Sequence, residues 1–89
     1  MDAQETQDAE AVALRALGWT LSDDSRASRL LALTGLTPET LRGRIGEPDL
    51  LAAVLRFLEA HEPDLVACAE ALTTTPLRLV ESRRMLEAR

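Results

Sequence analysis

Four prolines divide this 89-residue chain into short segments, and each proline stands where a helix is expected to begin. Proline lacks an amide hydrogen, and the first turn of a helix tolerates it because that hydrogen would have no partner there. A threonine or an acidic residue precedes each proline. Threonine hydroxyls cap free amides, and carboxylates oppose the positive end of the helix dipole. The sequence therefore predicts helices that begin near residues 38, 48, 63 and 76.

Between the prolines, apolar residues recur at intervals of three, four and seven, the periodicity of an amphipathic helix. The predicted stripes are Leu51, Val54, Leu55 and Leu58, with Leu50 and Phe57 beside them, in residues 47–60; Leu65, Cys68, Ala69 and Leu72 in residues 63–72; and Leu79 and Leu86, with Val80, in residues 76–88. Upstream, Asp23 or Asp24 is expected to cap a helix that ends at Gly35. The pattern predicts an all-α fold, a compact bundle of about six short helices joined by tight turns.

The first predicted helix, residues 6–21, carries apolar side chains on two sides. These sets are Leu14, Leu17 and Leu21 on one side, and Val12 and Trp19 on the other. A helix that is apolar on two faces is usually central in a bundle, which is the interpretation preferred for this segment. The alternative is that one face is buried and Trp19 is offered to a partner. Residues 1–5 are expected to fray.

Composition agrees with helices and with one domain that spans residues 1–89. Hydrophobic residues make up 46% of the chain, and most of them are the strong helix formers leucine, with seventeen copies, and alanine, with fourteen. Aromatic residues make up only 2%. A chain of this length ordinarily folds as one domain, and no segment resembles a linker.

Charge and cysteine content restrict the function classes. The net charge is −5, with fifteen acidic residues against ten arginines and no lysine, so phosphate backbones are repelled overall. The single cysteine, Cys68, cannot form an internal disulfide, which suits a reducing compartment. The first residues lack the basic and apolar regions of a secretory signal, and no apolar run is long enough to cross a membrane. The sequence therefore predicts a cytoplasmic protein without membrane association.

No catalytic, metal-binding or cofactor-binding residue is predicted. A metal site needs several clustered ligands, whereas the chain has one histidine, His61, and one cysteine. His61 is expected to cap the carboxyl end of a helix, and Cys68 to be a small buried hydrophobe. A Cys68–His61 nucleophile pair is the remote alternative. The chain is not expected to be an enzyme.

Residues 69–79 resemble a helix-turn-helix, because a short turn separates two predicted helices. The second helix is locally basic: it carries Arg78, Arg83, Arg84 and Arg89 against Glu81 and Glu87. The turn lacks the usual glycine at Thr73, and Ser82 stands where an apolar residue is expected. Arginines also suit this end of a helix because they complement its dipole. A solvated helix end is therefore preferred over a DNA-recognition helix.

Several short motifs carry a resemblance to a known family. In chain order they are Leu17-Gly18-Trp19, Leu33-Thr34-Gly35-Leu36, Glu47-Pro48, Val54-Leu55-Arg56-Phe57-Leu58 and Ala60-His61-Glu62-Pro63. With these motifs the chain is similar, from about residue 9 to residue 88, to a small alphaproteobacterial family known only as domain of unknown function 3572. The resemblance implies a compact cytoplasmic helical bacterial protein and supplies no activity, cofactor or functional residue. The Thr73-Thr74 pair departs from the family pattern.

These observations predict a protein–protein interaction or regulatory module whose partner is another protein. The candidate partner surface consists of Trp19, Arg78, Arg83 and Arg84. Trp19 would supply the apolar anchor, and the arginines a charged rim for an acidic partner. The alternative function is a helix-turn-helix-like nucleic-acid binder that uses the arginine-bearing last helix, and self-association is the alternative for the partner.

Overall fold

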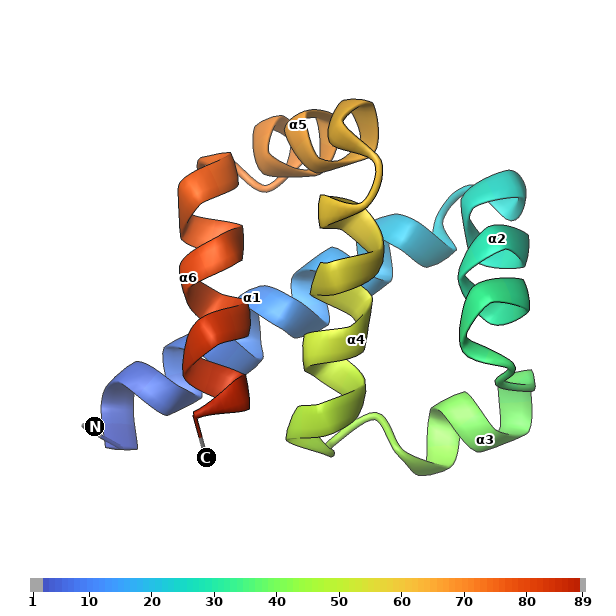
Figure 1. The fold of residues 1–89 in the computed structure, drawn as a ribbon, viewed down its shortest axis with the longest axis horizontal. Helices are drawn as coiled ribbons and strands as arrows, with labels where there is room; N and C mark the ends of the chain where they lie inside the picture. The colour runs from blue at the N-terminus through green and yellow to red at the C-terminus, as the bar shows by residue number, and fades with distance from the viewer. Residues whose placement is uncertain (1–2, 89) are drawn as a thin grey trace.

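The computed structural model describes residues 3–88, except for the side chains of residues 3 and 6. This part of the chain forms six helices and no strand, which confirms the predicted all-α bundle (Figure 1). The helices are α1 (Ala3–Leu21), α2 (Asp24–Thr34), α3 (Pro38–Gly43), α4 (Pro48–Glu59), α5 (Glu62–Ala71) and α6 (Pro76–Glu87). The radius of gyration, 12.0 Å, is that of a compact chain of this length.

Helices α2 to α6 begin at, or within one residue of, the positions that the capping residues predict. Pro38, Pro48 and Pro76 are first helical residues, and Pro63 is the second residue of α5. The hydroxyls of Thr37 and Thr75 accept hydrogen bonds from the amides of Thr40 and Arg78, and the carboxylate of Asp23 accepts one from the amide of Arg26. Gly35 ends α2 with a φ of 72°, the left-handed conformation that glycine adopts without strain.

Helix α4 supplies the largest share of the core. Seven of its twelve residues are buried: Leu50, Leu51, Ala52, Val54, Leu55, Phe57 and Leu58. Helices α4 and α6 stand side by side with α1 crossing behind both, α2 lies beyond α4, and α5 lies across the upper ends of α4 and α6 (Figure 1). The core therefore forms where α1, α4 and α6 meet, closed at one end by α5.

Helix α1 has the central position predicted for it, since it packs against α2, α4, α5 and α6, but the expectation that both apolar stripes are buried was wrong. Of the leucine stripe only Leu17 is buried, while Leu14 and Leu21 are exposed; Val12 and Trp19 are partly buried against the core. The buried face lies between the two predicted stripes and consists of Ala9, Ala13, Ala16, Leu17 and Thr20. The small alanine side chains allow α4 and α6 to approach the α1 backbone closely. The buried hydroxyl of Thr20 donates to the carbonyl of Ala16 at 2.9 Å, so it has a partner.

Helix α1 also begins earlier than predicted. Residues 3–5, which were expected to fray, are helical, and residues 1 and 2 lie outside the described part of the chain. Alanine, glutamine and glutamate are good helix formers, and an acidic side chain such as Glu5 is favourable in a first helical turn.

The turn between α5 and α6 replaces the missing glycine with a strained threonine. Thr73 has a φ of 56°, in the left-handed region that β-branched residues rarely adopt. The amide of Thr74 donates to the carbonyl of Ala69 at 2.8 Å, the bond that closes a Schellman motif at the end of α5. Two threonines therefore form a turn for which glycine is the usual residue.

Candidate functional site

The predicted surface arginine Arg83 is an internal ion-pair partner. Its Nε donates to Oε2 of Glu59 at 2.5 Å, and its Nη1 donates to Oε1 of Glu87 at 2.6 Å. Its side chain is only 19% exposed. The hydrogen bond from Arg83 to Glu59 is the main reason why the pKa of Arg83 lies above its ordinary value. Arg83 is therefore neutralised by acids of α4 and α6.

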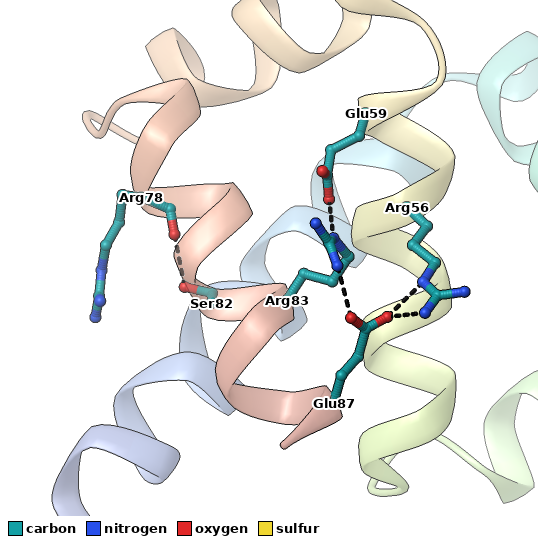
Figure 2. Close-up of polar contacts among 6 residues, drawn as sticks. All are labelled: Arg56, Glu59, Arg78, Ser82, Arg83 and Glu87. Carbon is teal, nitrogen blue, oxygen red and sulfur yellow. Dashed lines mark hydrogen bonds and ion pairs between the residues drawn. The ribbon is translucent and has the colours of Figure 1, made fainter. Parts of the chain in front are cut away.

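A second arginine extends this arrangement into a four-residue chain. Arg56 of α4 donates through Nε and Nη2 to Oε2 of Glu87 (Figure 2). Glu59, Arg83, Glu87 and Arg56 thus alternate in charge, sum to zero, and connect α4 with α6. Partial burial raises the pKa of Glu87, but the hydrogen bonds from Arg56 and Arg83 outweigh it, so the net pKa is below the ordinary value.

The remaining arginines of α6 do not continue this arrangement. In Figure 2 the side chain of Arg78 extends to the opposite side of α6 from Arg83. Arg84 is exposed on α6. The predicted apolar position at Ser82 is fully buried, and its hydroxyl is satisfied because it donates to the carbonyl of Arg78 at 2.8 Å. Arg78, Arg83 and Arg84 therefore do not form one continuous cationic face.

Trp19 lies at the junction of α1 and α2. The guanidinium carbon of Arg26 is 3.7 Å from the centroid of the indole ring, and Nη2 of Arg26 donates to the Trp19 carbonyl. The side chain is partly buried and packs against the core. Trp19 thus contacts α2, whereas Arg83 contacts α4, and the structure does not join these two predicted residues into one site.

His61 does not cap the end of α4, contrary to the prediction. It occupies the N-cap position of α5, and its Nδ1 lies 3.0 Å from Oδ2 of Asp64, the same oxygen that accepts a hydrogen bond from Arg29 at 2.8 Å. Burial raises the pKa of Asp64, but the hydrogen bonds with Arg29 and His61 outweigh the effect of burial. The net pKa of Asp64 is therefore below its ordinary value. The chain turns so tightly after Ala60 that the residue expected to finish α4 starts α5 instead.

Cys68 is fully buried, as predicted. Burial raises the pKa of its thiol to about 11, which leaves almost no thiolate at neutral pH. Its environment is that of a small core residue and not of a nucleophile. Over residues 3–88, no three His, Cys, Asp or Glu side chains are grouped closely enough to hold a metal ion.

The outward face of α5 combines apolar and acidic side chains in a way that the sequence analysis missed. A shallow hollow of about 390 Å³ is lined by Glu62, Pro63, Val66, Ala67 and Glu70. Val66 is 39% exposed. Among the described residues, no ion pair reaches Glu62 or Glu70. We call these five residues the α5 outer face.

A signal for this face was present in the sequence. The stripe Leu65, Cys68, Ala69 and Leu72 accounts for one side of α5, yet Val66 and Ala67 fall on the opposite side. In the sequence, a second apolar side is also evident on the first helix, where it attracts more attention because of Trp19. A helix at the edge of a bundle, apolar on the side that faces away from the core, is the more informative case.

A smaller hollow of about 220 Å³ opens between α4 and α6. It is lined by Asp49, Ala52, Ala53, Arg56 and Glu87, so it borders the four-residue ion-pair chain. The charges of Arg56 and Glu87 are already directed at each other there.

No helix in the described part of the chain is both long and apolar enough to cross a bilayer.

The model of a family described as "Protein of unknown function (DUF3572)" matches residues 6–89, nearly the whole chain. No curated protein and no solved structure matches.

Proposed function

The chain belongs to the DUF3572 family of proteins of unknown function, and we propose that it is a protein-binding or regulatory module with no catalytic activity of its own. The proposed site is the α5 outer face. We place the protein in the cytoplasm of a bacterium, where a reducing environment suits the unpaired thiol of Cys68.

The observation that carries this proposal is the open apolar hollow on α5. Helix α5 buries Cys68 and Ala69 on its inner side, yet it also presents Val66 and Pro63 around a hollow on its outer side. Exposed apolar side chains are normal on any protein, and Leu33 of α2 and Leu77 of α6 are exposed without lining either hollow. Apolar side chains gathered in a hollow with a polar rim are typical of interaction sites.

The distribution of arginines favours a protein partner over a nucleic acid. A recognition helix needs cations free to contact phosphates. Arg83, central to that alternative, is paired with two carboxylates, and Arg78 and Arg83 project from different sides of α6. The net charge of −5 adds repulsion of phosphate.

Site-specific photocrosslinking in cells that naturally express the protein tests this proposal. A photoreactive amino acid replaces Val66 in one variant and Arg42, which is exposed on α3, in a matched control. We expect the probe at position 66 to form discrete adducts with a different protein, identified by mass spectrometry. The control position should form none of these adducts.

Two outcomes would contradict the proposal. One is the absence of protein adducts at position 66, or identical adducts from both positions. The other is an adduct only with a second copy of the chain, which would replace a heterologous partner with self-association. Far-UV circular dichroism of both variants verifies that each retains its helices.

A further inference from the structure

We infer that the α5 outer face binds a cationic amphipathic segment of its partner protein, with an apolar side chain seated on Val66 and basic side chains beside Glu62 and Glu70. This inference rests on the proposed function and specifies the chemistry of the partner. It is carried by the apolar centre of the face and by the two carboxylates that flank it.

The centre of the face has short side chains. Pro63, Val66 and Ala67 leave the hollow shallow and open, and a longer apolar side chain from a partner would fill it. Residues 62, 66 and 70 succeed one another at intervals of four and therefore lie along one side of the helix. The apolar contact is thus framed along the helix axis by one carboxylate on each side.

The charge of the face is uncompensated. Helix α5 contains Glu62, Asp64 and Glu70 and no basic residue. Asp64 is paired with Arg29 of α2 and with His61, so its charge is already used. Arg15 of α1, which approaches the far end of α5, donates to the carbonyl of Leu72. Two carboxylates, separated by eight residues and so by about 12 Å along the helix, remain for a partner.

This spacing selects the chemistry of the occupant. Lysine or arginine residues seven or eight positions apart on a partner helix would lie beside Glu62 and Glu70 and place an apolar residue over Val66. Such charges increase the association rate and exclude acidic competitors more than they increase affinity. Phosphate-bearing partners, whether nucleic acid or an anionic lipid surface, meet repulsion at the same two carboxylates.

Titration of the ¹⁵N-labelled protein with two designed helical peptides tests the inference. Both peptides carry a leucine stripe; one has arginines four positions before and after the central leucine, and its isomer has glutamates there. We expect the arginine peptide to shift the amide resonances of residues 62–71, with an affinity that falls as salt is added. The glutamate peptide should leave those resonances unchanged.

Two double variants distinguish the effect of the α5 outer face on peptide binding from the effect of the overall charge of the protein. Glu62→Gln with Glu70→Gln should weaken binding of the arginine peptide about tenfold, because two exposed ion pairs are lost. Glu39→Gln with Glu81→Gln removes the same charge from α3 and α6 and should change binding less than twofold. Val66→Ser should weaken binding without removing charge, and circular dichroism shows whether each variant is folded.

The outcomes distinguish this inference from the proposed function. Three results would overturn the inference that the partner segment is cationic. They are equal binding of both peptides, no binding of either peptide, and equal losses of affinity in the two double variants that remove charge. A crosslinked protein at position 66 would still support protein binding in those cases. If position 66 yields no protein adduct and the arginine peptide shifts only residues outside α5, both proposals fail.

Discussion

The guanidinium of Arg26 covers the indole ring of Trp19, with 3.7 Å between the guanidinium carbon and the ring centroid. The same guanidinium bonds the carbonyl of Trp19 at 2.7 Å and the hydroxyl of Ser22 at 3.1 Å. One side chain of α2 therefore shields the largest apolar side chain of α1 and also ties the turn between the two helices. Trp19 is part of the structure at this corner and not a freely exposed anchor.

Replacing Arg26 by alanine should lower the free energy of unfolding by about 2 kcal/mol, because the cation–π contact and charged hydrogen bonds are lost. Urea unfolding measures the change. Iodide should also quench Trp19 fluorescence more strongly in the variant than in the parent. Arg42→Ala, which removes an exposed arginine from α3, is the control with little expected effect on either measurement. Unchanged quenching in Arg26→Ala would contradict the shielding of Trp19.

Thr73→Gly should stabilise the protein by about 1 kcal/mol, because it relieves a β-branched residue held at a positive φ. The melting temperature should rise by about 4–8 °C, which calorimetry measures. Gly35→Ala is the matched change in the opposite direction: it introduces a Cβ at a φ of 72° and should lower the melting temperature. A lower melting temperature for Thr73→Gly would show that the turn prefers threonine.

Arg83→Ala and Arg84→Ala should differ although the residues are neighbours. Arg83→Ala breaks the ion pair with Glu59 of α4 and the ion pair with Glu87 within α6, and it should reduce the free energy of unfolding by about 1–2 kcal/mol. Arg84 is exposed, and its removal should change stability by less than about 0.5 kcal/mol. Chemical unfolding of the two variants compares them directly, and equal losses would contradict the four-residue ion-pair chain.

Stability should decrease in acid. The pKa values of Asp64 and Glu87 lie below their ordinary values of 3.8 and 4.5 in the folded protein. The unfolded chain therefore binds protons more readily than the folded protein does. The stabilisation from these two carboxylates is complete when the pH is above their ordinary pKa values, and it is lost as the pH falls through their lower pKa values in the folded protein. Asp64→Asn with Glu87→Gln should flatten the decline in unfolding free energy below pH of about 5. Glu81→Gln, elsewhere on α6, is the control, and an equal slope in the double variant would contradict the assignment.

Cys68 should react slowly with thiol reagents in the folded protein. A pKa of about 11, against an ordinary value of 9.0, lowers the thiolate population near pH 8 about a hundredfold, and burial restricts access further. Reaction with Ellman's reagent should therefore be at least about a hundred times slower in buffer than in denaturing urea. Comparable rates in the two solvents would mean that Cys68 is accessible.

The helices themselves were largely determined by local sequence. Thr37, Thr75, Asp23 and Gly35 act through atoms within a few residues, so their capping roles followed from spacing. The apolar stripe of α4 was also predictable from the sequence, because leucine, valine and phenylalanine recur there at helical spacing.

Only the tertiary structure decided which side of α1 is buried and which charges are available. Alanines at positions 9, 13 and 16 became core because α4 and α6 pack against them, and α6 could not be placed there from the sequence of α1. Arg83 is not available to a partner, because it donates a hydrogen bond to Glu59, twenty-four residues earlier, across the α4–α6 contact. Capping and periodicity are local properties, whereas burial and charge pairing depend on groups distant in the chain. Within residues 3–88, the positions of those distant groups leave the carboxylates of the α5 outer face without a cationic partner.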